Sequence, residues 1–241
     1  YVKNATIKNL GIENGIVFGK EETAGLIGRA ASTTVEGCFN NAKVIATGKH
    51  AGGLIAQMSG TSSVKNCYNT ADVTTASTTA GGIVGYVASS TTVSVENCYH
   101  KGTLSDSSGN CGLIGSYATS GNYQCKSVTV TNCYSTQPLK GSGVQENAEI
   151  EHYTACQVVS KARLVSAAIA LGEKFIYDCS WNNEGYPVFT WQEQTQLPEN
   201  LNITTAAELR LIAFMVNSGA DNFAGKTIRN FFKFFCKRGR F

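Results

Sequence analysis

The chain has 241 residues, of which only 15% are charged, and its formal net charge is +3. A charge this small, without basic patches interleaved with aromatic residues in the repeats, argues against a nucleic-acid partner. No stretch is apolar enough to cross a bilayer, so we expect no direct membrane insertion, and we expect any signal peptide or anchor to lie outside this segment.

A repeated unit occupies the first 140 or so residues. Its best copy runs from Val64 to Tyr86 and joins Val64-Lys65-Asn66-Cys67-Tyr68 to a glycine-rich core, Gly81-Gly82-Ile83-Val84-Gly85. The length changes between copies fall in Ser/Thr/Gly links, which is typical of coils with one cross-section whose insertions bulge outward. One column marks the spacing, with steps of 28, 29, 31 and 35 residues between Leu10, Cys38, Cys67, Cys98 and Cys133.

The repeat predicts strands rather than helical hairpins. Its apolar runs are short, β-branched and bounded by Gly, Asn, Ser or Thr, and no 3.6-residue periodicity is sustained. A composition with 25 Gly and only 3 Pro agrees with a turn-rich solenoid. We therefore predict an all-β fold, a parallel β-helix of about four to five coils with strands about 4.8 Å apart, and expect it to be right-handed.

Four columns of the repeat have a predicted place in each coil. β-branched residues form an inward ladder: Ile7, Val35, Val64, Val95 and Val130. Asn or Gly, which tolerate positive φ, mark a corner at Asn9, Gly37, Asn66, Asn97 and Asn132, so that the following Leu10/Cys column faces inward. Close-packed turns are expected at Gly53, Gly82 and Gly112.

A column of charges lies between the inward ladder and the corner. Opposite charges on adjacent strands stabilise a sheet by roughly 0.2–1 kcal/mol per pair, so the alternation of sign supports this alignment of the coils. We interpret the column as a solvated ladder that fixes stability and register, and a ligand-binding stripe is the alternative. Its members are Lys8, Glu36, Lys65, Glu96 and Thr131.

Four of the nine cysteines share the column in which the first copy has Leu10. This substitution indicates a small apolar filler, and we predict buried thiols, with Cys67→Val costing little and Cys67→Asp severely disruptive. The odd total and unpaired spacing argue against a disulfide framework, and the lack of C-x-x-C or a His pair argues against zinc. The nine are Cys38, Cys67, Cys98, Cys111, Cys125, Cys133, Cys156, Cys179 and Cys236.

Catalytic constellations are weak in the repeats. Only two carboxylates share a column, Glu36 and Glu96, and Lys65 lies between them. Their strands are separated by one intervening coil, a distance that long side chains could adjust toward the carboxylate spacing of an inverting glycosidase. A reactive pair of Cys98 and His100 would need an exposed thiol, and we expect His100 on the surface, in the column of Asn40, Asn69 and Ser135. The other carboxylates are Glu13, Glu21, Glu22, Asp72 and Asp106, and the remaining histidines are His50 and His152. We therefore predict no catalytic, cofactor-binding or metal-binding residues.

The pattern changes after the repeats. Ser160 to Leu171 is predicted to form a helix that ends at Gly172 and covers an end of the solenoid. Aromatic segments follow at Phe175-Ile176-Tyr177, Trp181 and Tyr186 to Trp191, with a turn at Asn182 to Gly185. A capping box at Thr205 to Glu208 opens a second helix, Ala206 to Val216, and a strand is expected to begin within Phe223 to Ile228.

We divide the chain into three parts: repeats over 1–145, a closing segment with a helix and a Trp/Tyr-rich strand over 146–196, and the start of a further module over 197–241. The last residues, Phe231 to Phe241, fit nothing before them and indicate a truncated or aberrant end. A membrane-surface tail is the alternative for these residues.

The motifs Gly25-Leu26-Ile27-Gly28 and Gly81-Gly82-Ile83-Val84-Gly85, coupled to Asn-Cys-Tyr, resemble the GLUG-repeat family of bacterial surface proteins over about residues 5–139. Members are typically large, secreted or wall-attached and adhesin-like, and the repeats also accompany some immunoglobulin-A-specific metallopeptidases. The family carries no agreed catalytic residues. In the family, an acidic strand usually comes after the segment that ends at Ile228. The residues from Asn230 onward depart from that pattern.

The resemblance implies a non-catalytic structural or adhesive repeat module of a secreted or cell-surface bacterial protein. Its expected location is extracellular, and its expected partners are host glycans or surface proteins and other domains of a larger chain. It implies no cofactor. The alternative is a fragment of a β-helix enzyme that acts on polysaccharides as a lyase or hydrolase.

Overall fold

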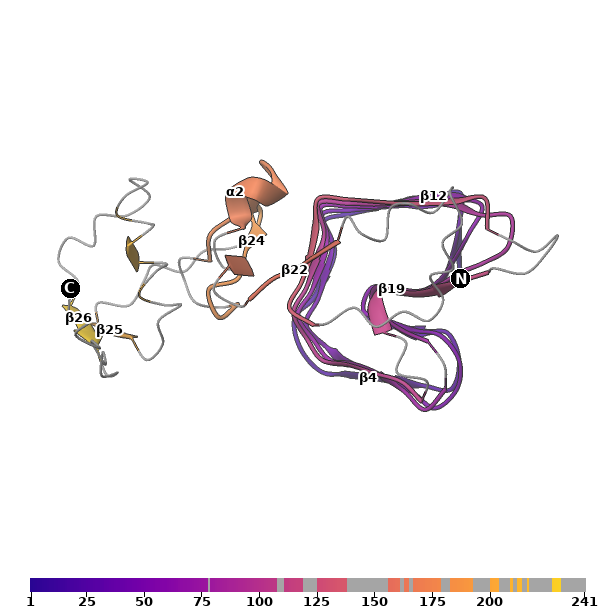
Figure 1. Ribbon diagram of the computed structural model, residues 1–241, viewed down its shortest axis with the longest axis horizontal. Coiled ribbons are helices and arrows are strands. Elements are labelled where there is room, and N and C mark those ends of the chain that lie inside the picture. The colour runs from indigo at the N-terminus through magenta and orange to yellow at the C-terminus, as the bar shows by residue number, and fades with distance from the viewer. Residues whose placement is uncertain are drawn as a thin grey trace, which may run out of the picture. The chain divides into compact units, whose positions relative to one another are not determined.

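The structure is a computed structural model, shown in Figure 1. It divides into two compact units, one of residues 1–160 with 170–174 and one of residues 161–169 with 175–241. The described residues are 1–77, 79–107, 111–118, 125–137, 156–160, 163–164, 167–178, 183–192, 200–203 and 227–230, together with 209, 212, 213 and 216.

The first unit is a parallel β-helix, as predicted from the repeats. The coils contribute strands to four parallel sheets, which appear as superimposed turns in Figure 1. Sheet A holds β1 (Val2–Lys3), β5 (Thr23–Ala24), β6 (Ile27–Ala31), β10 (Ala51–Gly52), β11 (Ile55–Ser59), β15 (Ala80–Val87) and β19 (Cys111–Tyr117). Sheet B holds β2 (Thr6–Lys8), β7 (Thr34–Glu36), β12 (Thr61–Lys65), β16 (Thr92–Glu96) and β20 (Ser127–Thr131).

Two further sheets complete each coil. Sheet C holds β3 (Gly11–Ile12), β8 (Phe39–Asn40), β13 (Tyr68–Asn69), β17 (Tyr99–His100), β21 (Cys133–Ser135) and β22 (Cys156–Val158). Sheet D holds β4 (Ile16–Gly19), β9 (Lys43–Ala46), β14 (Val73–Thr75) and β18 (Leu104–Ser105). Sheets B and D lie on opposite sides of the coil in Figure 1, where β12 and β4 mark them.

The corner between sheets B and C is made by the predicted Asn/Gly column. Every member has the left-handed conformation, with φ between 49° and 64°: Asn9, Gly37, Asn66, Asn97 and Asn132. Amide groups of the column also bond along it, because Nδ2 of Asn97 donates to Oδ1 of Asn66 over 3.1 Å and Nδ2 of Asn132 donates to Oδ1 of Asn97 over 2.7 Å. The corner therefore repeats both a backbone angle and a hydrogen bond.

The described residues of the first unit include two apolar core clusters. The larger contains the predicted β-branched ladder, and Val35, Val64 and Val95 have no exposed surface. The smaller lies under sheet D and contains Val44, Ala46, Ala51, Val73 and Ala80. Leu10 occupies the position of Cys38 in the first coil and is 45% exposed, because at this end of the stack it has a column neighbour on one side only.

The two clusters meet at a waist where glycine allows sheet A to approach sheet C. A Cβ on Gly53 would lie 2.5 Å from Nδ2 of Asn69, and a Cβ on Gly82 would lie 2.5 Å from the His100 ring. The predicted close packing is therefore confirmed for these two residues. The prediction that Gly82 and Gly112 lie in turns is wrong, because these two residues lie inside β15 and β19.

Aromatic rings form a ladder on sheet C. Phe39, Tyr68 and Tyr99 occupy one column, with ring centroids 5.1 Å and 4.9 Å apart and nearly parallel planes. All three are buried. Such offset stacks stabilise by about 0.5–1.5 kcal/mol beyond burial, so the ladder adds to the alignment of neighbouring coils.

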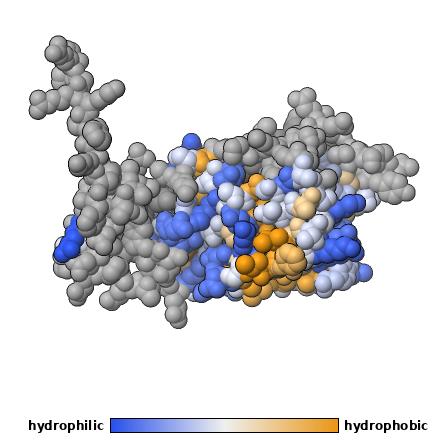
Figure 2. Space-filling view, turned by 90° about the horizontal axis from the view of Figure 1, so that it is seen from below, coloured by the Kyte–Doolittle hydropathy of each residue, from blue (hydrophilic) through white to orange (hydrophobic). Residues whose placement is uncertain are grey.

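Apolar side chains are also exposed on sheet D. Ile16 and Phe18 of β4 are 67% and 70% exposed, and Ile45 of β9 pairs with Phe18. Figure 2 views this side of the molecule and shows apolar residues gathered there.

Within the predicted helix Ser160 to Leu171, the structure shows helix at residues 163–164 and in α2 (Ala168–Leu171). Residues 161–162 and 165–166 lie outside the described residues. In the second unit, β23 (Phe175–Ile176) pairs antiparallel with β24 (Val188–Phe189). Strand β25 (Asn200–Ile203) pairs in parallel with β26 (Thr227–Asn230), which begins at the end of the predicted strand. Trp181, Cys179, Cys236, most of the second predicted helix and the residues 231–241 lie outside the described residues.

Candidate functional site

The outer face of sheet B carries the predicted charge column. The pairings of β2, β7, β12, β16 and β20 place Lys8, Glu36, Lys65, Glu96 and Thr131 side by side in consecutive coils. Nζ of Lys8 lies 2.8 Å from Oε2 of Glu36, and Nζ of Lys65 lies 3.5 Å from Oε2 of Glu96. The hydrogen bond from Lys8 lowers the pKa of Glu36. The predicted alignment of the charges is confirmed.

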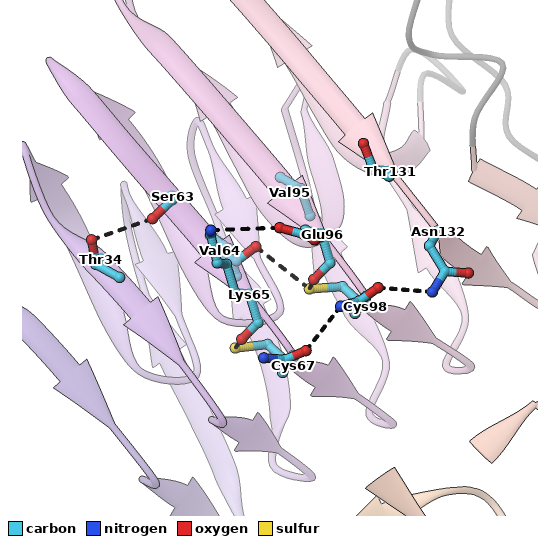
Figure 3. Close-up of polar contacts among 12 residues, drawn as sticks. Thr34, Ser63, Val64, Lys65, Cys67, Val95, Glu96, Cys98, Thr131 and Asn132 are labelled. Carbon is cyan, nitrogen blue, oxygen red and sulfur yellow. Dashed lines mark hydrogen bonds and ion pairs between the residues drawn. The ribbon is translucent and has the colours of Figure 1, made fainter. Parts of the chain in front are cut away.

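A column of small hydroxyl side chains runs beside the charges. It consists of Thr6, Thr34, Ser63, Ser94 and Thr129, which pair from coil to coil. Oγ of Ser63 donates to Oγ1 of Thr34 over 3.3 Å, as Figure 3 shows together with the Lys65–Glu96 pair. Period-2 alternation sends these residues outward, since Val35, Val64 and Val95 between the columns point into the core. Sheet B thus presents two regular polar columns on one face.

The structure does not bring Glu36 and Glu96 together. Lys65 separates them in the column and forms its ion pair with Glu96. Asp72 is engaged elsewhere, because its Oδ1 accepts hydrogen bonds from the backbone N–H and the hydroxyl of Thr103 over 2.8 Å and 2.6 Å. Among the described residues, no group of three or more His, Cys, Asp or Glu side chains is placed to hold a metal ion.

The cysteine column is buried, as predicted, and its members are free thiols: Cys38, Cys67, Cys98 and Cys133. Cys156 extends the column through its pairing with Cys133. Burial raises the pKa of the Cys98 and Cys156 thiols, which keeps them protonated and unreactive at neutral pH.

The thiols also have a polar role that the apolar-filler interpretation missed. Sγ of Cys67 donates to the carbonyl oxygen of Lys65 over 3.0 Å and accepts the backbone N–H of Cys38 over 3.4 Å. Sγ of Cys98 and Sγ of Cys133 donate in the same way to the carbonyls of Glu96 and Thr131. Cysteine therefore fills a small apolar space and satisfies backbone groups at the corner.

The prediction that His100 lies on the surface is wrong. Asn40, Asn69, His100 and Ser135 are all fully buried, and they form a polar column at the waist of the coil. Nδ2 of Asn40 donates to Oδ1 of Asn69 over 2.9 Å, and Nδ1 of His100 lies 3.0 Å from Nδ2 of Asn69. Burial lowers the pKa of His100 to about 4. Sequence alone suggested exposure because polar residues fill the column.

A polar cluster on sheet A escaped the sequence analysis. The carboxylate of Glu22 pairs with the guanidinium of Arg29, and the His50 ring stacks on Tyr86 with centroids 4.3 Å apart. Nδ1 of His50 lies 2.9 Å from Oγ1 of Thr79, and burial lowers its pKa. Glu22 and His50 both have positive φ. Strand register places Glu22 and His50 in one column and Arg29 and Tyr86 in another, and alignment of the repeats gave no signal that these two columns meet.

In the part of the chain that the structure describes, no helix has the length and apolar character needed to cross a membrane.

Comparison with known proteins gives a match to a family model. The model of a family described as the GLUG motif matches residues 47–74, which include β11, β12, β13 and Cys67 and so cover most of one coil. No curated protein and no solved structure matches the chain. The resemblance to the GLUG-repeat family is thereby confirmed, and the first unit is a β-solenoid repeat module that carries the GLUG motif.

Proposed function

We propose that the chain is a non-catalytic structural and adhesive module of a secreted or cell-surface bacterial protein. The observation that carries the proposal is the outer face of sheet B, where a Ser or Thr hydroxyl recurs in every coil and Lys and Glu alternate beside it over four coils. A repeated face suits many equal weak contacts, which add through multivalency. A catalytic site would instead need several titrating groups to converge at one coil.

The coil geometry supports a display or spacer role as well. Each coil adds about 4.8 Å along the axis, so the length of the stack sets the separation of whatever lies at its two ends. Stability comes from contacts between neighbouring coils, which allows the number of coils to vary without a change of fold. Host glycans, host surface proteins and other domains of a larger chain are the proposed partners.

Cell attachment by the parent protein tests the adhesive role. The parent is compared with a variant in which residues 1–196 are replaced by an inert spacer of equal length. Loss of attachment in the spacer variant supports adhesion. Unchanged attachment leaves only the spacer role.

An activity screen tests the non-catalytic part of the proposal. The chain is incubated with a panel of polysaccharides and assayed for lyase and hydrolase products. Binding without turnover supports the proposal. Turnover that is abolished by Glu36→Gln or Glu96→Gln would replace it with the polysaccharide-active enzyme.

A further inference from the structure

The charge column of sheet B remains accessible on the outside of the first unit. The side chains of Lys8, Glu36, Lys65 and Glu96 are 57%, 27%, 45% and 42% exposed, although they form two ion pairs within the chain. An exposed ion pair contributes only about 0–1 kcal/mol, because solvent screens it, so each of these charges can also interact with a further partner at little cost. The column is therefore a patterned surface as well as an internal ladder.

The order of the charges makes this surface complementary to itself. The column reads Lys, Glu, Lys, Glu over four consecutive coils. A two-fold axis parallel to the strands, placed between the coils of Glu36 and Lys65, reverses this order. Lys8 then faces Glu96 of the second copy, and Glu36 faces Lys65 of the second copy, so all four positions meet an opposite charge. Two copies aligned in the same direction, with equivalent coils facing one another, would place like charges opposite one another.

The neighbouring side chains allow two such faces to approach. The column beside the charges holds only Thr and Ser, whose short side chains leave the sheet surface low: Thr6, Thr34, Ser63, Ser94 and Thr129. Lys174 lies close enough to the column to contribute to the lowered pKa of Glu36. It adds positive charge near Glu36 and does not change the order of the four column residues.

We propose that this face docks on the same face of a second copy of the chain, with the two coil axes antiparallel. The proposal rests on the adhesive function proposed above and names its partner as another copy. Five strands about 4.8 Å apart and three to five residues long give a footprint of roughly 300–400 Å² per copy. Stable complexes bury about 800 Å² per partner, so one contact is weak and arrays of copies carry the adhesion.

Two variants isolate the order of the charges from their number. Lys8→Glu with Glu36→Lys keeps the net charge and allows both ion pairs within the chain, but the column then reads Glu, Lys, Lys, Glu. In the antiparallel arrangement this swapped column places like charges opposite at all four positions. The inverted variant adds Lys65→Glu and Glu96→Lys, reads Glu, Lys, Glu, Lys, and is again complementary to itself.

Bead clustering measures the weak contact through many copies. The full chain is coupled in one orientation to beads of two colours, and clusters are counted by flow cytometry after circular dichroism has shown equal β content in all variants. We expect beads with the natural chain to cluster, beads with the inverted variant to cluster equally, and beads with the swapped variant to stay single. Mixed clusters of natural and inverted beads should be about tenfold rarer than clusters of one kind, which corresponds to about 1.4 kcal/mol.

Ionic strength provides the second readout. Clustering should fall steeply between about 0.01 M and about 1 M salt, where the Debye length drops from about 30 Å to about 3 Å. Equal clustering by the swapped variant, free mixing of natural and inverted beads, or no clustering of the natural chain would each overturn the proposal. Such failures leave the attachment result unchanged, so self-docking and adhesion to a foreign surface can fail separately.

Discussion

At the scale of single residues, the cysteine column shows how a side chain can serve packing and backbone satisfaction together. Cys67 is fully buried, yet its sulfur contacts the backbone N–H of Cys38 and the carbonyl oxygens of Lys65 and Val35. A buried N–H left without an acceptor costs about 1–3 kcal/mol. A side chain at this position must therefore fill the available volume and also bond to the neighbouring backbone groups.

Cys67→Val should destabilise the protein by about 1–3 kcal/mol, because the backbone N–H of Cys38 loses its acceptor. This revises the small cost expected from the sequence. Urea unfolding measures the change, and hydrogen exchange of the Cys38 amide locates it. Unchanged stability and exchange would restore the interpretation of cysteine as an apolar filler.

His100 should make the free energy of unfolding depend on pH between about pH 4 and pH 6.5, which is above the range in which carboxylates usually titrate. Its pKa is about 4 in the folded chain and near 6.5 when exposed. The unfolded chain therefore binds a proton that the folded chain does not, so stability is full above about pH 6.5, falls as the pH drops, and levels off below about pH 4. The total loss is about 3 kcal/mol at 1.36 kcal/mol per pKa unit.

His100→Asn provides the control for this window, because Asn40 and Asn69 fill the same column in neighbouring coils. Thermal unfolding between pH 4 and 7 should lose most of its slope in the variant. The remaining slope is expected from His50, whose pKa is also lowered. An identical pH profile in both proteins would show that His100 is not held neutral.

At the scale of the structural element, the corner and the waist define the coil. The corner depends on a residue with positive φ, and the waist depends on glycine, which has no side chain to block the approach of sheets A and C. Asn97 has φ 51° and bonds to both neighbours in its column, while Gly82 lies directly against the His100 ring.

Asn97→Ala should cost about 1–2 kcal/mol for the left-handed backbone, plus about 1 kcal/mol for each column hydrogen bond. Asn97→Gly should cost less, because glycine accepts the same φ, as Gly37 does in the same column. Chemical denaturation of both variants checks the order. A larger loss for Gly than for Ala would show that the backbone angle is not the reason for Asn.

Gly82→Ala should destabilise by about 1–3 kcal/mol, because the added Cβ would lie 2.5 Å from the His100 ring. The double variant Gly82→Ala with His100→Ser should recover part of the loss, since Ser135 shows that the column accepts serine. The coupling free energy from the double-mutant cycle measures the contact directly. Additive effects would place the strain elsewhere.

At the scale of the whole molecule, the solenoid should tolerate the loss of a complete coil. Deleting residues 64–94 joins Ser63 to Val95 in register, because Ser63 pairs with Ser94 and Val64 with Val95. The shortened chain should fold cooperatively with a lower Tm, since one interface between coils is lost. Circular dichroism and a thermal scan check this.

The same deletion brings Glu36 beside Glu96, and adding Glu96→Lys restores the alternation of charges. The restored variant should melt at a higher temperature than the simple deletion. Deleting about half a coil is the negative control, because it turns core side chains to the wrong face. Cooperative melting of the half-coil deletion would contradict the register derived from the columns.

The sequence by itself determined the parallel coil, the inward valines, the left-handed corner, the buried thiols and the order of the charges. These features repeat, and in-register stacking converts a column of the alignment into a column in space. Only the tertiary structure decided that His100 is buried and that Glu22, Arg29, His50 and Tyr86 meet. Both depend on the path of the chain within a single coil, where the glycines of sheet A let it come close to the side chains of sheet C. Comparison between coils shows which residues share a column, but it does not show which columns meet.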